Sequence, residues 1–141
     1  MAFSMGQMST ERIVAEAAAD STAQRRISIV DDDASIREAL TSLMRAVRYN
    51  VDSFGSAEEF LASGLANEIA CLILDVYLPG MDGFELQNRL RTDGHGVPII
   101  FITAHADEGS RRRALENGAV DLLGKPVRRE ILFKALHSAI A

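Results

Sequence analysis

The chain has 141 residues, of which 48% are hydrophobic and 25% charged, a composition that is ordinary for a single globular domain with a buried core. The net charge of −5 argues weakly against a nucleic-acid-binding surface, and no apolar run approaches the roughly 18 residues of a membrane span. The single cysteine, Cys71, excludes a disulfide within the chain, which fits a reducing compartment, and we expect it to be a buried small hydrophobe.

Residues 1–25 differ from the rest of the chain. MAFSMGQMST has no hydrophobic period and contains three of the five methionines. Helix formers then follow a candidate cap at Ser9 and Thr10. We therefore predict an N-terminal extension or leader, with a short helix, before a main domain at 26–141. The N-terminal segment 1–25 lacks the basic flank and apolar core of a secretion signal.

The first half of the main domain alternates strand and helix patterns. The β-branched run RISIV predicts a strand at 26–30, and apolar residues at helical spacing predict a helix over 34–47. NVDSF predicts a second short strand at 50–54. Ser56 with Glu59 predicts a capping box for a helix that ends near residue 64.

The second half repeats this alternation. The apolar run ACLILD at 70–75 is typical of a strand that is buried on both faces, and turn residues follow it in VYLPGMDG. Two further strands are predicted at 97–103 and 119–124, and three helices at 84–91, 107–117 and 129–140. Five strands that alternate with five helices predict an α/β fold with a parallel sheet and helices on both faces.

Charged residues gather where these predicted strands end. Asp31, Asp32 and Asp33 follow the first strand, Asp75 ends the third, Thr103 ends the fourth, and Lys125 follows the fifth. In a parallel sheet these side chains meet at one edge, which is where such folds bind ligands. Crowded carboxylates raise one another's pKa unless a cation is present, and one lysine cannot balance three of them. Mg²⁺ suits such oxygen ligands, and Mn²⁺ or another divalent cation could substitute for it.

The remaining groups suggest phosphoryl chemistry. The hydroxyl of Thr103 and the ammonium of Lys125 are hydrogen-bond donors beside the acidic cluster, an arrangement that suits an incoming anion. An aspartate such as Asp75 can act as a nucleophile and form an acyl phosphate.

Four motifs of the chain resemble a known family. IVDDD, LILDVYLPGMDG, FITA and GKP are similar to the signatures of the response-regulator receiver domain, in its CheY-like, FixJ group. The resemblance covers about residues 26–141, and the four motifs in this order are together highly specific. It implies a flavodoxin-like, doubly wound sheet of five parallel strands in the order 2-1-3-4-5, with five helices.

The resemblance also implies a role for each motif residue. Asp75 would be the phosphoacceptor, and Mg²⁺ would be held by Asp31, Asp32, Asp75 and the backbone carbonyl of Tyr77. Thr103 would hydrogen-bond the phosphoryl group, for which Ala104 leaves room. Lys125 would pair with Asp75 or its phosphate, and the peptide bond from Lys125 to Pro126 would be cis. Asp33 has no metal role in the family, so we expect it to cap the first helix.

The implied function is a phosphorylation switch. A histidine kinase or phosphotransfer protein would donate a phosphoryl group to Asp75, and the domain would change conformation to signal to a partner or output domain. The domain would not be an enzyme in the usual sense, although it would phosphorylate itself from small donors and dephosphorylate itself. We expect a cytoplasmic protein with no membrane or direct nucleic-acid contact in this segment, and a dimer through the fourth-helix, fifth-strand and fifth-helix face.

Other readings stay open from the sequence. The domain could be a receiver-like scaffold that acts without phosphorylation, or an aspartyl-phosphate phosphatase of the haloacid-dehalogenase type. That phosphatase needs an acidic residue two positions after its nucleophile, where Tyr77 stands, and a cap for which the chain is short. Tyr77 and His105 either tune hydrolysis of the acyl phosphate or are plain exposed residues. The run 111–113 of three arginines is interpreted as a solvated helix face, with a partner contact as the alternative.

Two positions depart from the family pattern. Leu122 stands where receivers of this type usually carry an aromatic switch residue, and Val127 stands where they favour phenylalanine. Leu122 can still repack when phosphate draws in Thr103, but it has no ring to rotate. Both changes fall on the face where output is usually read. Whether the domain stands alone or belongs to a longer regulator stays open.

Overall fold

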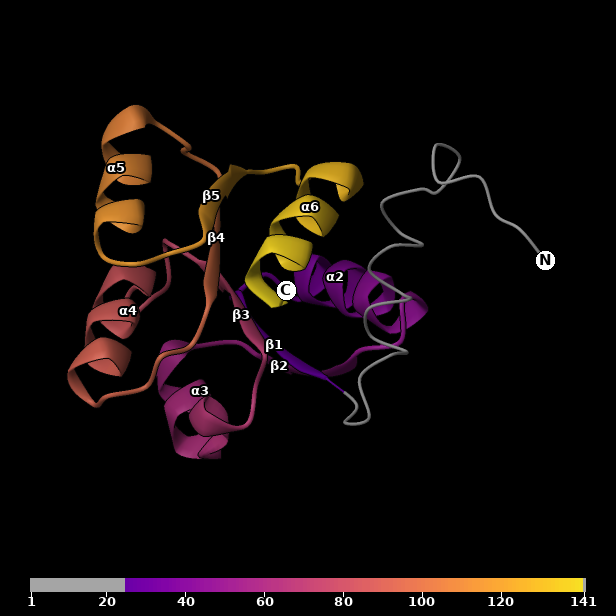
Figure 1. Cartoon of the computed structure of the whole chain (residues 1–141), viewed down its shortest axis with the longest axis horizontal. Helices are drawn as coiled ribbons and strands as arrows, with labels where there is room; N and C mark the ends of the chain where they lie inside the picture. Colours follow the sequence, from indigo (N-terminus) through magenta and orange to yellow (C-terminus); the bar gives the residue numbers. More distant parts are fainter. Residues whose placement is uncertain (1–24, 141) are drawn as a thin grey trace.

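A computed structural model describes residues 25–140 of the chain as alternating strands and helices (Figure 1). In chain order the elements are β1 (Arg26–Val30), α2 (Ala34–Ala46), β2 (Asn50–Phe54), α3 (Ala57–Ser63), the 3-10 helix η2 (Leu65–Asn67), β3 (Cys71–Asp75), α4 (Gly83–Thr92), β4 (Ile99–Thr103), α5 (Glu108–Glu116), β5 (Asp121–Gly124) and α6 (Arg129–Ile140). The predicted extension at 1–25 lies, except for its last residue, outside the described part of the chain, and the predicted domain division stays a prediction.

The five strands form one parallel sheet in the order β2-β1-β3-β4-β5. The order reverses at β1, which pairs with β2 on one side and with β3 on the other, so that β1 and β3 flank the switch point. This confirms the predicted α/β, flavodoxin-like fold with its strand order. The five predicted helices are all present, and the short η2 is an addition that the sequence pattern did not indicate.

Helices cover both faces of the sheet (Figure 1). Side chains alternate along each strand, so that in β3 Cys71 and Ile73 face α2 and α6, while Leu72 and Leu74 face α3, α4 and α5. All five residues of β3 are buried. Burial on both faces explains why this strand reads as a continuous apolar run in the sequence.

The start of α3 differs from its predicted capping box. Ser56 caps the helix, since its Oγ accepts a hydrogen bond from the Glu59 N–H at 3.1 Å. The Glu59 carboxylate, however, accepts from the N–H of Gly55 at 2.8 Å, one residue earlier than a capping box requires. A complete capping box opens α4 instead, between Asp82 and Glu85, where we predicted only a turn.

Two smaller expectations concern burial. Cys71 is a fully buried free thiol, as predicted, and burial raises its pKa to about 12. Over residues 25–140, none of the helices combines the length and the apolar character that crossing a membrane requires.

Candidate functional site

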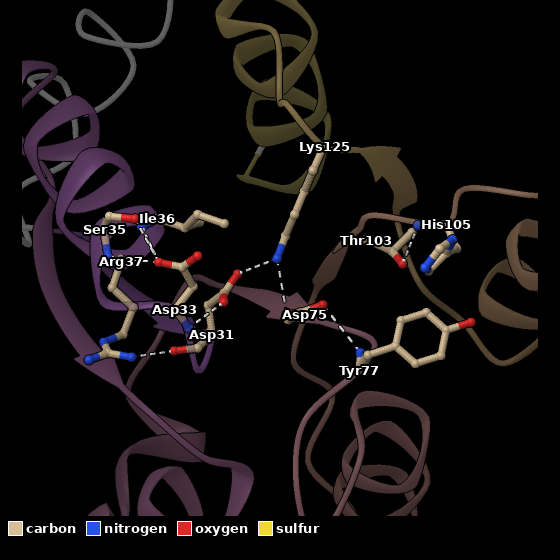
Figure 2. Close-up of polar contacts among 10 residues, drawn as sticks. All are labelled: Asp31, Asp33, Ser35, Ile36, Arg37, Asp75, Tyr77, Thr103, His105 and Lys125. Carbon is tan, nitrogen blue, oxygen red and sulfur yellow. Dashed lines mark hydrogen bonds and ion pairs between the residues drawn. The ribbon is translucent and has the colours of Figure 1, made fainter.

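The carboxyl ends of β1 and β3 bring three carboxylates together, of which Figure 2 draws Asp31 and Asp75. Asp31 follows β1, Asp32 comes next in the turn to α2, and Asp75 is the last residue of β3. One carboxylate oxygen from each of them lies within 4.8 Å of the other two. Asp31 is fully buried and Asp75 is 4% exposed, whereas Asp32 is exposed. The neighbouring strand ends therefore gather the acidic cluster that the sequence predicts.

Lys125 bridges two of these carboxylates. Its Nζ lies 2.9 Å from Asp31 Oδ2 and 3.1 Å from Asp75 Oδ2 (Figure 2). The sequence indicated the contact with Asp75 but not the one with Asp31. The peptide bond from Lys125 to Pro126 is cis, as the family resemblance implied.

The Lys125 ammonium only partly offsets the burial and mutual repulsion of the clustered carboxylates. Burial raises the pKa of Asp75 above its usual range, the hydrogen bond from Lys125 opposes that shift, and the charge of Asp31 adds to it. Burial by itself would lower the pKa of Lys125, but hydrogen bonds and charges from both aspartates outweigh it and raise that pKa. Asp75 is therefore a carboxylate in surroundings that do not fully compensate its charge.

Asp33 does not join the three clustered carboxylates. It caps α2, because its Oδ1 accepts hydrogen bonds from the N–H of Ser35 at 2.9 Å and of Ile36 at 3.4 Å. The Ser35 hydroxyl donates to the same oxygen at 2.7 Å and is the main cause of the lowered pKa of Asp33. The prediction that the third aspartate opens the first helix is confirmed.

Thr103 ends β4 at the same edge of the sheet. Its side chain is fully buried, and its Oγ1 accepts a hydrogen bond from the backbone N–H of His105 at 3.1 Å. Its carbonyl accepts from the N–H of Lys125 at 2.8 Å, which ties the end of β4 to the residue that follows β5. A hydroxyl can still donate one hydrogen bond while it accepts another, so Thr103 keeps a donor for an anion.

A hollow of about 550 Å³ lies beside Asp75. Its lining residues are Asp75, Tyr77, Ala104, His105, Asp107 and Lys125. Tyr77 is 54% exposed, and its ring meets the His105 ring edge-on, with the ring centroids 5.7 Å apart. The backbone N–H of Tyr77 donates to Asp75 Oδ1 at 3.2 Å. Both aromatic residues thus line the space from which Asp75 is reached, and Ala104 contributes only a methyl group there.

The loop after β3 closes tightly on Asp75. A Cβ added to Gly83 would stand 2.3 Å from the carbonyl oxygen of Asp75, so the close approach requires glycine. Glu58 of α3 holds the other side of the loop, because its Oε2 accepts from the N–H of Met81 at 2.9 Å. The sequence pattern did not single out Glu58, since the contact spans 23 residues.

Arg37 is a second residue that the sequence analysis missed. Its Nη1 donates to the backbone carbonyl of Asp31 at 2.6 Å (Figure 2). A signal was present in the sequence, because Arg37 lies in the first turn of α2, where the helix dipole disfavours a cation. In this structure the hydrogen bond to Asp31 offsets that unfavourable position.

The two departures from the family pattern flank Lys125 in the sequence and pack on opposite faces of the sheet, Val127 on the α2–α6 side and Leu122 on the other. Leu122 is 3% exposed and packs with the α3–α4–α5 side of the core, and its carbonyl accepts from Arg111 Nη1 at 3.2 Å. Arg111 also pairs with Asp121 at 2.8 Å, and the Arg113 guanidinium lies 4.3 Å from the centre of the Phe84 ring. All three arginines at 111–113 are exposed, as the interpretation of a solvated face requires, and Arg111 and Arg113 in addition make contacts within the domain that the sequence did not indicate.

The acidic cluster fits a magnesium ion. Its donors are three carboxylates on neighbouring strand ends, two of them buried, and hard oxygen donors are what Mg²⁺ requires. The pKa of the buried Asp75 is raised even beside Lys125, so its negative charge is not fully balanced, and a bound cation would stabilise it.

The comparisons with known proteins agree with this geometry. Residues 27–137 match the response regulator receiver domain family, and the chain belongs to that family. It is 44% identical to Nodulation protein W of Bradyrhizobium diazoefficiens over 113 residues, which are 80% of this chain and 50% of that protein. It is 34% identical to the transcriptional regulatory protein FixJ of the same species over 119 residues, 84% of this chain and 58% of that one.

Solved structures show the same fold. The response regulator StyR superposes with a TM-score of 0.78 at 39% identity, over 84% of this chain and 60% of StyR. The chemotaxis protein CheY4 of Vibrio cholerae superposes with a TM-score of 0.76 at 28% identity, over 83% of this chain and 99% of that one. The chain spans about half the length of curated relatives such as Nodulation protein W, which it matches over 50% of that protein.

Proposed function

We propose that this receiver domain accepts a phosphoryl group on Asp75 from a histidine kinase or a phosphotransfer protein, in a reaction that depends on Mg²⁺. One observation carries the proposal. Asp75 is a carboxylate beside an open hollow, clustered within 4.8 Å of two further carboxylates, and its Oδ2 lies 3.1 Å from an ammonium. This set of groups suits in-line transfer and neutralisation of charge, which phosphoryl transfer chiefly needs.

In the proposed step, a carboxylate oxygen of Asp75 attacks the phosphorus of a phosphohistidine. A phosphorus–oxygen bond forms, the phosphorus–nitrogen bond to the imidazole breaks, and its electron pair leaves with the imidazole nitrogen. Asp31, Asp32, Asp75 and the backbone carbonyl of Tyr77 would hold Mg²⁺, or Mn²⁺ in its place. When bound, the ion would offset the negative charge that these carboxylates and the phosphoryl oxygens bring together.

Phosphorylation changes the contacts of Thr103 and Lys125. The new group carries a charge of roughly −1.5 to −2. Lys125, which bridges two carboxylates, can donate to the phosphoryl oxygens, and so can the hydroxyl of Thr103. Movement of Thr103 would pull on its hydrogen bond with the N–H of His105 and shift the loop that leads to α5. Leu122, which has no ring to rotate, would respond by repacking, and the population of the second conformation would rise.

Tyr77 and His105 would set the lifetime of the phosphoryl group. Their edge-on ring contact lies at the rim of the hollow beside Asp75. A water molecule that hydrolyses the acyl phosphate has to enter through this hollow. The two rings would therefore slow self-dephosphorylation by restricting its approach.

The signal would pass to a partner or to an output domain. The face formed by α5, β5 and α6 carries exposed Leu115 and Ile131, and it would form the dimer contact that the family resemblance implies. Residues 26–141 would act as the receiver and 1–25 as an extension. We propose a cytoplasmic location and no direct nucleic-acid contact by this segment, whose net charge is negative.

One experiment separates this function from its two rivals. The protein is incubated with Mg²⁺ and acetyl phosphate or phosphoramidate, and its intact mass is followed. The proposal predicts an adduct of about 80 Da, one phosphoryl group, that is absent in Asp75→Asn and retained in the surface control Asp93→Asn. Steady hydrolysis of many phosphomonoesters would instead favour the phosphatase. The absence of an adduct in the wild-type protein would favour the scaffold and contradict the proposal.

A further inference from the structure

We infer that Arg37 is a positioning residue for metal binding, which sets the turn that carries Asp31 and Asp32. The inference rests on the proposed function, because it concerns the affinity of the acidic cluster for Mg²⁺. Arg37 belongs to α2 and lies outside the acidic cluster itself. It acts on the backbone between the two aspartates.

The contact is short and specific. Arg37 Nη1 donates to the carbonyl oxygen of Asp31 at 2.6 Å, in a partly buried setting (Figure 2). That carbonyl belongs to the peptide group that joins Asp31 to Asp32. Because a peptide group is planar, fixing the direction of its carbonyl also fixes the N–H of Asp32 and the direction in which that residue leaves the strand.

Asp31 and Asp32 depend on this peptide group to different degrees. Asp31 is held at its other polar atoms as well. Its N–H donates to Phe54 O at 3.1 Å, its Oδ1 accepts from the Asp33 N–H at 2.9 Å, and its Oδ2 pairs with Lys125. The exposed side chain of Asp32, by contrast, has neither a hydrogen bond nor an ion pair with any residue between 25 and 140. The position of the Asp32 carboxylate is therefore set by the backbone that Arg37 holds.

Arg37 is itself held in place. Its guanidinium packs beside Gly55 in the turn between β2 and α3, with Nη1 3.5 Å from the position that a Cβ on Gly55 would occupy. The Glu59 carboxylate lies 3.4 Å from the same position and accepts from the Gly55 N–H. Arg37 thus spans the space between the turn after β1 and the turn after β2, and it can hold one against the other.

A pure charge effect of Arg37 and a positioning role of Arg37 predict opposite changes in Mg²⁺ affinity when the guanidinium is removed. The guanidinium is a cation close to a cation site, so its field alone weakens Mg²⁺ binding, and its removal would tighten binding. Its hydrogen bond orders the turn that carries two ligands, so loss of that bond would weaken binding. The sign of the change in affinity therefore distinguishes positioning from a pure charge effect.

The test measures the Mg²⁺ dissociation constant by calorimetric titration of the whole chain. We expect Arg37→Met, which keeps an apolar stem but removes the donor, to weaken binding about tenfold, the scale found when groups that orient metal ligands are removed. Arg45→Met is the matched control, because it removes the same charge from the other end of α2, where Arg45 is exposed. We expect it to change the constant by less than about twofold, since its charge lies more than a Debye length away.

Arg37→Lys sharpens the test and covers the case in which Arg37→Met does not fold. A lysine keeps the charge but offers one flexible ammonium in place of the planar guanidinium, so positioning predicts an intermediate loss of affinity. A wild-type constant in Arg37→Lys, or tighter binding in Arg37→Met, would overturn the inference while leaving the proposed function intact. A wild-type protein that binds no Mg²⁺ would contradict the proposed function itself, and the inference with it.

Discussion

Two regions at the carboxyl edge of the sheet follow the receiver pattern to different degrees. At the ends of β1 and β3, every motif residue is present, and the structure gathers Asp31, Asp32 and Asp75 with Lys125. At β5 and α5, the pattern is broken by Leu122, which is buried and held at its carbonyl by Arg111. The first region therefore keeps all the motif residues that the family resemblance names there, while the second departs from the pattern at Leu122.

The two regions also differ in how stable they are without a ligand. The acidic cluster holds buried carboxylates whose repulsion one lysine does not fully offset, so a cation or a change of charge alters it strongly. Around Leu122 the contacts are apolar packing, the ion pair between Arg111 and Asp121, and the hydrogen bond from Arg111 to the Leu122 carbonyl. Changes at the first region should affect chemistry and stability together, and changes at the second should affect chemistry little.

The largest effect is expected from Asp32→Ala. The substitution removes an exposed metal ligand, so Mg²⁺ binding and phosphorylation from acetyl phosphate should be lost, with a rate at least about a hundredfold lower. The fold should be as stable as before or more stable, because one of three repelling charges is gone. Phosphorylation is followed by intact mass and stability by thermal unfolding, with Asp93→Ala as the surface control. Normal phosphorylation of Asp32→Ala would refute the metal assignment.

Lys125→Met should destabilise the metal-free protein. It leaves two buried carboxylates without their shared cation, and removal of one partner from a buried ion pair costs about 3–5 kcal/mol, less here because the lysine side chain is 17% exposed. Urea unfolding in EDTA measures the loss, with the exposed Lys134→Met as the control. Mg²⁺ should stabilise Lys125→Met more than the wild type, since it replaces the missing charge. Equal stability of both variants in EDTA would show that the bridge contributes nothing.

Asp75→Asn should stabilise the metal-free protein at neutral pH. Burial raises the folded-state pKa of Asp75 above its unfolded value, so the charged form is less favourable in the folded state. Its penalty is absent below the unfolded pKa, grows as pH rises through the folded pKa, and is fully present above it. Melting temperatures measured in EDTA should therefore rise by a few degrees in Asp75→Asn at pH 7 and converge with the wild type near pH 3. A lower melting temperature at pH 7 would mean that the ion pair with Lys125 outweighs burial.

Leu122→Phe should have the smallest effect on chemistry. Leu122 lies on the α3–α4–α5 side of the core and is 3% exposed, so a ring must be accommodated by repacking, at a cost of about 1–3 kcal/mol. The rate of phosphorylation from acetyl phosphate should stay within about twofold of the wild type, because the substitution leaves the acidic cluster unchanged. A tenfold change in that rate would show that the two regions are coupled in the chemical step.

Much of the fold and of the site could be predicted from the sequence. Apolar runs and helical spacing are local signals, and they predicted each strand and the five long helices. The motifs predicted that Asp31, Asp32, Asp75 and Lys125 meet, because strand ends in a parallel sheet share one edge. The role of Asp33 as a helix cap was also readable from its place before the first helix.

The contacts that were missed join distant parts of the chain or use the backbone. Glu58 of α3 accepts a hydrogen bond from Met81 in the loop after β3, 23 residues away. Arg37 was marked only by its unfavourable place in the first turn of α2, and its partner, the carbonyl of Asp31, is a backbone acceptor of a kind that every residue carries, so the sequence does not identify it. The second contact of Lys125, with Asp31, depends on the exact course of two loops. Arg111 is exposed, as expected, but its contacts with Asp121 and the carbonyl of Leu122 were missed because both partners lie on β5.

The central claim is that Asp75 is the residue that carries the phosphoryl group. After incubation with Mg²⁺ and acetyl phosphate, reduction with borohydride converts an aspartyl phosphate to homoserine, and peptide mass spectrometry locates it. The account predicts homoserine at position 75 in the wild-type protein, only when Mg²⁺ and the donor are both present. Homoserine at another aspartate, or none at position 75 in a protein that has gained a phosphoryl group, would contradict it.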